Sequence, residues 1–312
     1  MQIDAIANEC YGNPECADQV WISNNALSSS TVYGNVEWVS SSGGSGGGGS
    51  PPPPAPEPEP EPELQGCPRQ TISSGYFANS TGWSVWSGQY SRDFADVNGD
   101  CRDDLVGWNS STGDIQVGLS GGSYFGTSTG WGLWSGQYSR NFADVNGDGK
   151  ADIIGRNSLG NVQVGLSTGS YFANSTSWSS WGSVYSMALA DVNGDGRADL
   201  VGRDSSGNVQ VGLSTGSSFA ASTSWSSWGS VYSMALADVN ADGLADLVGR
   251  NSSGDVQVGL SAATYFRPSV GWSLWGSAYS LQFADGNGDG RDDIVGWNSS
   301  TGGVQLGLST SR

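Results

Sequence analysis

A unit of about 47 residues repeats along the chain, and this repeat limits the fold more than any other feature. Its most recognisable part is an aspartate-rich loop, and the loops begin at Asp96, Asp144, Asp191, Asp238 and Asp285. Two copies of the unit are identical from Ser175 to Asn193 and from Ser222 to Asn240. Self-similarity at a period of 20–50 residues is typical of solenoids, propellers and arrays. The chain is therefore predicted to contain five copies of one supersecondary unit.

Each unit reads as four short β-strands separated by turns. In the third unit the expected strands are 185–190, 199–203, 208–213 and a last stretch from Ser218 onward to Trp225. Gly, Asn, Asp and Ser fill the links between them, as tight turns require. Four strands in about 47 residues fit one propeller blade, since blades of the WD type use about 40–45 residues. The sequence therefore predicts an all-β fold, a five-bladed β-propeller with four-stranded blades.

The two ends of the repeat region suggest how such a ring closes. The last unit stops after Gly303 to Ser309, its third strand, and lacks an outer strand. Residues 73–81 precede the first loop and closely match the outer-strand segment 168–176. We expect the N-terminal strand to complete the last blade, with Tyr76 and Phe77 both buried there, because closure removes exposed strand edges.

Composition excludes several classes of function. The chain has no histidine, so Ser-His-Asp and Cys-His nucleophile systems and imidazole-ligated metals are absent. Its 12 basic and 30 acidic residues give a net charge of −18, which would repel a nucleic acid backbone. No run of residues approaches the roughly 18 apolar positions of a membrane-spanning helix. We expect no nucleic acid partner, no membrane span and no enzyme activity, since the loops claim nearly all the carboxylates.

The chain divides into three parts. Residues 1–42 are too few to bury a core alone. They are expected to be either a disordered acidic tail or a segment that anchors the protein or adds a strand to a neighbour. Residues 43–66 form a spacer, first rich in Gly and Ser and then in Pro and Glu. Residues 67–312 hold the predicted propeller.

The four cysteines favour an extracellular location. They form no C-x-x-C pair and have no histidine to complete a zinc site, so disulfides fit better than metal. We predict that Cys10 pairs with Cys16 and that Cys67 pairs with Cys101. The N-terminus shows no secretory signal, and a processed or trimmed start would reconcile this with an oxidising location.

The aspartate-rich loops have the form D-x-N-x-D-x-x-x-D, which offers carboxylates at positions 1, 5 and 9 and an amide at position 3. These oxygens, the main-chain carbonyl at position 7 and a water match the 6–8 oxygen ligands of Ca²⁺. Strand residues follow position 9 directly, so the loop is not an EF-hand. The alternative is that Asn-Gly and Asp-Gly simply form hairpin turns.

About five calcium ions are therefore expected, one in each loop. The predicted ligands are Asp96, Asn98, Asp100, Arg102 and Asp104; Asp144, Asn146, Asp148, Lys150 and Asp152; Asp191, Asn193, Asp195, Arg197 and Asp199; Asp238, Asn240, Asp242, Leu244 and Asp246; and Asp285, Asn287, Asp289, Arg291 and Asp293. The residues at position 7 would contribute only their carbonyls.

These segments, such as DVNGDGRADLVGRDSSGNVQVGLSTGS, resemble the FG-GAP or VCBS repeats of integrin α-chain propellers, secreted bacterial proteins and some fungal lectins. The resemblance covers residues 70–312 and implies a calcium-bound propeller used in adhesion or ligand binding. Many members have seven blades, so five is a departure. Cys101 and Ala241 replace loop glycines without removing a ligand.

Every unit also contains a Trp-x-x-Trp pair. Residues three apart cannot share one face of a regular strand, so one tryptophan of each pair could be exposed to stack on a sugar, or both could pack between blades. The pairs are Trp83 and Trp86, Trp131 and Trp134, Trp178 and Trp181, Trp225 and Trp228, and Trp272 and Trp275. In another strand, Trp108 and Trp297 replace Arg156, Arg203 and Arg250, which would tune ligand specificity or vary on a solvated face.

Two functions follow from these observations. The first is an extracellular, calcium-binding propeller that binds glycans, as a lectin does, or binds a cell-surface or extracellular protein as an adhesion module. The second is a structural subunit of an extracellular fibre, pilus or surface appendage, which self-assembles or is anchored through residues 1–42.

Overall fold

A computed structural model describes Gly82, residues 88–183 and residues 185–310. These residues form nineteen β-strands and no helix. The all-β prediction is therefore confirmed. The expected segments 1–42 and 43–66, and the closing strand at 71–81, lie outside the described residues.

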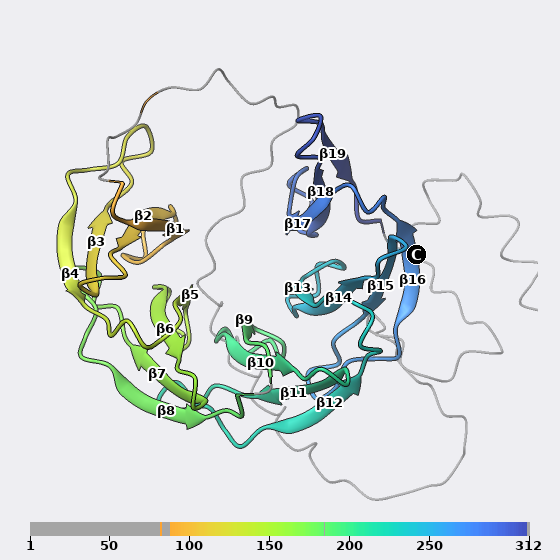
Figure 1. Ribbon diagram of the computed structural model, residues 1–312, viewed down its shortest axis with the longest axis horizontal. Helices are drawn as coiled ribbons and strands as arrows, with labels where there is room; N and C mark the ends of the chain where they lie inside the picture. The colour runs from red at the N-terminus through yellow and green to blue at the C-terminus, as the bar shows by residue number, and fades with distance from the viewer. Residues whose placement is uncertain (1–81, 83–87, 184, 311–312) are drawn as a thin grey trace, which may run out of the picture. The chain divides into compact units, whose positions relative to one another are not determined.

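The strands form five antiparallel sheets, which we call blades A to E (Figure 1). Blade A contains β1 (Ser91–Ala95), β2 (Asp104–Trp108), β3 (Asp114–Gly118) and β4 (Thr129–Leu133). Blade B contains β5 (Asn141–Ala143), β6 (Asp152–Arg156), β7 (Asn161–Gly165) and β8 (Thr176–Ser180). Blade C contains β9 (Ala188–Ala190), β10 (Asp199–Arg203), β11 (Asn208–Gly212) and β12 (Thr223–Ser227). Blade D contains β13 (Ala235–Ala237), β14 (Asp246–Arg250), β15 (Asp255–Gly259) and β16 (Val270–Leu274). Blade E contains β17 (Ser280–Ala284), β18 (Asp293–Trp297) and β19 (Val304–Gly307).

Each blade is a simple meander in which neighbouring strands along the chain are also neighbours in the sheet. The first strands lie innermost and the fourth strands outermost, and β9 lies beside both β5 and β13 (Figure 1). This arrangement confirms the five-bladed propeller. Within the described residues blade E has three strands, and its completion by the N-terminal segment stays a prediction.

The fourth strand begins later than the sequence predicted. Ser218 and Phe219 precede β12, and Phe219 forms only an isolated bridge with Ser214. The pairing of β11 with β12 is also irregular, with a register shift between Val209 and Gln210. Equivalent shifts occur in blades A, B and D, so each outer strand carries a conserved bulge.

The core lies between blades as well as within them. The second and third strands supply alternating buried Val, Leu and Ile side chains, as half-buried strands do. Trp181, at the end of blade B, covers Gly202 and Gly212 of blade C. A Cβ on Gly202 would lie only 2.6 Å from the Nε1 atom of Trp181. Glycine is needed at this position because the neighbouring blade brings a tryptophan against its backbone.

Hydrogen bonds between blades repeat along the chain. The amide of Ala198 in blade C donates to the carbonyl of Asp144 in blade B at 2.7 Å, and Ala151, Ala245 and Asp292 make the same bond to Asp96, Asp191 and Asp238. The amide of Phe219 donates to the carbonyl of Trp178 at 3.3 Å. The propeller is therefore joined by main-chain bonds as well as by apolar packing.

Candidate functional site

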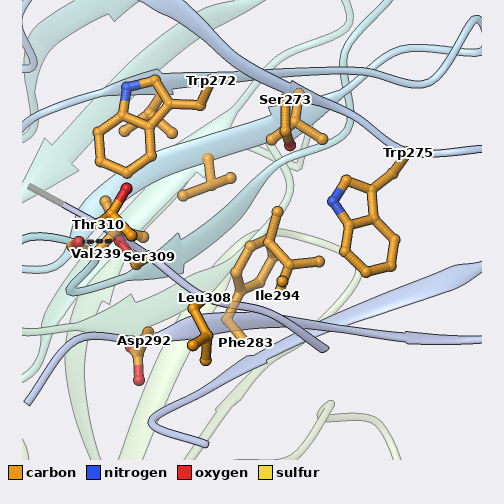
Figure 2. A pocket seen from close by; sticks show the side chains of 14 residues that line it. Val239, Trp272, Ser273, Trp275, Phe283, Asp292, Ile294, Leu308, Ser309 and Thr310 are labelled. Carbon is orange, nitrogen blue, oxygen red and sulfur yellow. Dashed lines mark hydrogen bonds between the residues drawn. The ribbon is translucent and has the colours of Figure 1, made fainter. Parts of the chain in front are cut away.

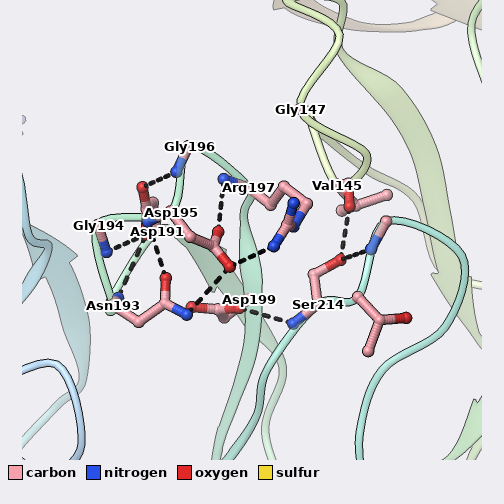
Figure 3. A network of polar contacts seen from close by, with 12 residues as sticks. Val145, Gly147, Asp191, Asn193, Gly194, Asp195, Gly196, Arg197, Asp199 and Ser214 are labelled. Carbon is pink, nitrogen blue, oxygen red and sulfur yellow. Dashed lines mark hydrogen bonds and ion pairs between the residues drawn. The ribbon is translucent and has the colours of Figure 1, made fainter. Parts of the chain in front are cut away.

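The candidate site is the set of aspartate-rich loops that join the first and second strands of each blade. The third loop, from Asp191 to Asp199, represents the set (Figure 3). Asp191 at position 1 follows β9 directly, and Asp199 at position 9 begins β10. The two strands therefore bring the ends of the loop together, because Asp199 pairs with Ala190 in the sheet.

The position 1 carboxylate folds the loop around itself. One oxygen of Asp191 accepts a hydrogen bond from the Gly194 amide at 2.7 Å, and the other accepts one from the Gly196 amide at 2.8 Å. Asn193 accepts from the amide of Asp195 at 3.0 Å. The two glycines have φ values of +81° and +78°, in the left-handed region that favours glycine. The hairpin-turn alternative thus accounts for many of the contacts seen in the loop.

Two loops hold a residue with a side chain where the others have glycine. Cys101 has φ +65° at position 6, and Ala241 has φ +61° at position 4. The expectation that Cys101 adopts a glycine-like conformation is confirmed. Its predicted disulfide with Cys67 stays a prediction, because Cys67 lies outside the described residues.

Position 5 is paired with the basic residue at position 7 in four of the five loops. Asp195 lies 2.7 Å from the Arg197 guanidinium, and Asp100, Asp148 and Asp289 pair with Arg102, Lys150 and Arg291 at 3.1–3.2 Å. The fourth loop has Leu244 at this position. Its Asp242 instead accepts a hydrogen bond from the side-chain amide of Asn240 at 2.8 Å.

The position 9 carboxylates are fully buried in all five loops. One oxygen of Asp199 accepts from the Ser214 amide at 2.7 Å and the other from the Val192 amide at 3.2 Å. Burial nevertheless raises the pKa of Asp152, Asp199 and Asp246 to about 7, and repulsion from the carboxylates at positions 1 and 5 adds to this rise. The same causes raise the pKa of Asp104.

The donor set fits a hard cation in its chemistry, since positions 1, 3, 5 and 9 all offer oxygen. Within the described residues, however, no three Asp, Glu, Cys or His side chains lie close enough together to hold a metal ion. In four loops the position 5 carboxylate faces its basic neighbour instead. Calcium binding by the predicted residues therefore stays a prediction, and it requires these side chains to turn towards a common point.

The exposed tryptophan expected in each pair is not found in blades A to C. Trp131, Trp134, Trp178, Trp181, Trp225 and Trp228 are all 2–6% exposed. The first tryptophan packs on a phenylalanine of the next blade, as Trp178 does on Phe219 with ring centres 5.4 Å apart. The second covers glycines of the next blade. Both members therefore pack between blades, and neither offers a face to a sugar.

The remaining tryptophan pairs differ in what the structure describes. Trp272 and Trp275 on blade D are half-buried and line a pocket of about 150 Å³. The other pair, Trp83 and Trp86, lies outside the described residues.

Exposed aromatic side chains occur instead at the tyrosines of the repeated Tyr-Phe pair. Tyr124, Tyr171 and Tyr265 are 50–56% exposed, whereas Phe172 and Phe266 are buried. The idea that both members of such a pair are buried is therefore wrong. Adjacent residues of an extended chain point to opposite faces, and this rule could have identified the exposed tyrosines from the sequence.

The position shared by Trp108, Trp297 and three arginines belongs to the contacts between blades. Arg250 on β14 donates to the carbonyl of Tyr279, in the connection to blade E, at 2.6 Å. Arg156 and Arg203 donate to Tyr185 and Tyr232 in the same way. In blade A the cation is on the other side, because the Arg140 guanidinium lies 3.2 Å from the Trp108 ring centre. The solvated-face interpretation is thus wrong for these four positions.

Comparison with known proteins identifies the repeats. Residues 144–202 and 191–249 each match the family model of the FG-GAP-like repeat. No curated protein matches the chain. Solved structures with a similar fold include the computationally designed Ika8 protein (14% identity, TM-score 0.36, covering 72% of this chain and 65% of that one). Others are BBS1N in complex with ARL6DN (13%, 0.42, 73% and 68%) and YCF48 from Cyanidioschyzon merolae (12%, 0.41, 66% and 66%).

Five meander blades with an aspartate-rich loop after each first strand define a β-propeller of repeated modules. The matched repeats specify the family, and this propeller is an FG-GAP β-propeller. Such repeats typically occur in extracellular or surface proteins and are generally non-enzymatic, so the fold suggests an adhesion-like module. Within the described residues, no helix is long and apolar enough to cross a membrane. The chain spans less than two thirds of the length of the designed Ika8 protein and of YCF48.

Proposed function

We propose that this propeller is a calcium-stabilised adhesion module of an extracellular or cell-surface protein. One observation carries the proposal: all five loops retain the four side-chain oxygen ligands while differing at other positions, including Cys101, Ala241 and Leu244. A hairpin turn alone needs the glycines and the position 1 carboxylate, and it gives no reason to bury an aspartate at position 9. A divalent cation bound beside that aspartate would offset the cost of its burial.

Calcium would be held by the carboxylates at positions 1, 5 and 9, the amide oxygen at position 3 and the carbonyl at position 7. When bound, the ion supplies two positive charges to three carboxylates that otherwise repel one another. In the third loop, Asp195 would exchange the Arg197 guanidinium for the ion. Asp199 would remain ionised in the core, where its two amide donors already hold its orientation.

The fourth loop provides an internal comparison. Leu244 places no cation beside Asp242, so calcium there competes with no ion pair. We expect this loop to bind calcium more tightly than the other four. A Leu244→Arg variant should weaken that site, and Arg197→Leu should strengthen the third one.

Thermal melting in Ca²⁺ and in EGTA tests the proposal. Any ion that binds only the folded protein raises its stability by RT ln(1 + [L]/Kd), which is about 2.7 kcal/mol at 100 Kd. The melting temperature should therefore rise with calcium concentration. Mg²⁺ should be less effective, because it demands a stricter octahedral geometry. An identical melting temperature in EGTA and in millimolar Ca²⁺ would contradict calcium binding.

Carbohydrate binding is a second candidate, and the exposed tyrosines favour it. Tyr171 and Tyr265 occupy equivalent places on different blades, so the propeller would present several rings at a regular spacing. Exposed aromatic faces can stack on sugar rings. Blade C has Ser218 at this place, which shows that the fold accepts serine there. On a glycan array, a Tyr171→Ser and Tyr265→Ser double variant should lose the binding seen with the unmodified protein; retention of binding would exclude these tyrosines.

A further inference from the structure

Three interfaces between blades use the same aromatic contact. A phenylalanine that follows the third strand of one blade packs on the first tryptophan of the preceding blade. The ring centres of Trp131 and Phe172 lie 5.3 Å apart, and the pairs of Trp178 with Phe219 and Trp225 with Phe266 lie 5.4 Å apart. Each phenylalanine is 3–7% exposed and belongs to the core between its two blades. A full interface therefore needs this ring.

The interface between blades D and E has a pocket where the phenylalanine would lie (Figure 2). The pocket holds about 150 Å³ and is lined by Trp272, Trp275, Phe283, Ile294 and Leu308, together with valines of blade D. Trp272 is half-buried, whereas its counterparts are almost fully buried. A dry apolar cavity of about 150 Å³ can hold a benzene ring. Blade E lacks the phenylalanine because the chain ends three residues after Ser309.

A second contact differs between blades in a pattern that runs around the ring. At the end of the second strand the residue is Trp in blade A, Arg in blades B, C and D, and Trp in blade E. The residue that faces it from the start of the following blade is Arg140 opposite Trp108, but Met187, Met234 and Leu281 opposite the arginines. Each interior interface thus has one cation, supplied from one side or the other.

Blade E ends its second strand with Trp297, which is 53% exposed. The first strand of blade A carries Arg92 at the position equivalent to Arg140. If blade A follows blade E, tryptophan again faces arginine, and all five interfaces obey one rule. The pattern of tryptophans is displaced by one blade from the pattern of arginines, as expected for a closed ring of five.

We propose that blade A docks on the open face of blade E within the same chain, with Arg92 stacked on Trp297 and Phe77 in the pocket beside Trp272. This proposal concerns assembly of the fold and does not depend on the proposed function. The N-terminal segment leads directly into β1, just as β8 leads into β9 in the interior. Docking within one chain is favoured over docking between copies because the two faces are covalently linked at high effective concentration.

A double-mutant cycle in the full-length protein tests the stacked pair. Arg92→Met and Trp297→Arg should each lower the melting temperature by about 2–4 °C, the shift expected for roughly 1 kcal/mol in a domain of this size. The double variant should recover most of this loss, because it recreates the Arg203 and Met234 arrangement. The same cycle at Arg140 and Trp108 is the control, since that pair is present in the structure.

Mass measurement during size-exclusion chromatography decides which chain supplies the occupant. Recovery in a monomer whose melting temperature is independent of protein concentration supports docking within the chain. Recovery only in a dimer overturns it in favour of exchange between two copies. Purely additive losses at positions 92 and 297, with coupling at 108 and 140, overturn the pairing itself.

The pocket has an independent test that does not rely on the stacked pair. Phe77→Ala should lower the melting temperature about as much as Phe219→Ala does, whereas Tyr76→Ala should have little effect, because its counterparts are exposed. Equal and small effects of Phe77→Ala and Tyr76→Ala would remove Phe77 from the pocket.

Discussion

The hydroxyl group of Ser261 in blade D donates a hydrogen bond to the main-chain carbonyl of Val192 in blade C, at a distance of 2.7 Å. Val192 is the second residue of an aspartate-rich loop, and Ser261 follows the third strand of the next blade. The amide of Ser261 also donates to the buried Asp246 carboxylate at 2.7 Å. One serine therefore links the loop of its own blade to the loop of the preceding blade, and Ser167 and Ser214 repeat the arrangement.

Loss of this hydroxyl should destabilise the propeller. In Ser261→Ala the buried carbonyl of Val192 loses its donor, and an unsatisfied buried group costs about 1–3 kcal/mol. Ser252→Ala, in an exposed turn of the same blade, is the control and should be nearly neutral. Equal unfolding free energies for the two variants in urea would show that the bond between blades contributes nothing.

The buried aspartate should not tolerate replacement by asparagine, even without calcium. Both oxygens of Asp199 accept main-chain N–H groups, so the side-chain NH₂ of Asp199→Asn would face a donor. We expect a loss of about 1–3 kcal/mol in EGTA. The matched control is Asp255→Asn, because blade C already carries Asn208 at the equivalent exposed position. A neutral Asp199→Asn variant would mean that this carboxylate does not organise the loop.

Stability without calcium should fall as the pH rises from about 5 to 8. The native pKa of Asp152, Asp199 and Asp246 is about 7, above the ordinary value of 3.8, so the folded state binds more protons than the unfolded state in this range. Unfolding free energy must then decrease with pH. The chain has no histidine to obscure the effect.

Urea titrations at several pH values, in EGTA and in saturating Ca²⁺, measure this dependence. Calcium favours the ionised carboxylates, so it should reduce or reverse the trend. If stability in EGTA rises with pH over this interval, the buried aspartates are ionised at little cost and the argument for a neutralising cation is weakened.

Restoring glycine in the fourth loop should stabilise the protein. Ala241 has φ +61°, a conformation that costs an L-residue roughly 1–2 kcal/mol, and part of this gain is offset by the greater chain entropy of glycine. Ala241→Gly is therefore expected to add about 0.5–1 kcal/mol. The reverse change in the third loop, Gly194→Ala, should destabilise, since its Cβ would lie 2.8 Å from Leu244. A destabilising Ala241→Gly would contradict strain at this position.

Much of the fold was predictable because the sequence repeats. The spacing of the loops defined five units, and the alternation in segments such as 208–213 located the second and third strands to within a residue. The tryptophan pairs were harder to interpret. The rule about residues three apart assumes a regular strand, but Trp228 lies one residue beyond β12 and a bulge precedes it. Its partner is the backbone of Gly249 in the next blade, a contact distant in sequence.

The candidate site was predictable in composition but not in geometry. Spacing alone identified Asp191, Asn193, Asp195 and Asp199 as one group of oxygen donors. It gave no sign that Arg197 would pair with Asp195, since a basic residue at position 7 could equally point to solvent. Nor did it indicate that Asp199 would be buried with both oxygens already bonded, because this depends on the amide of Ser214 from the following turn.

Calorimetric titration of the full-length, metal-free protein with Ca²⁺ tests the central claim most directly, because it counts the ions bound. We predict about five ions per chain, and a count lower by one when Asp195 is replaced by Ala, with no change for the control Asp255→Asn. Absence of saturable binding heat at several temperatures, or a count that does not change in Asp195→Ala, would contradict the assignment of calcium to these loops.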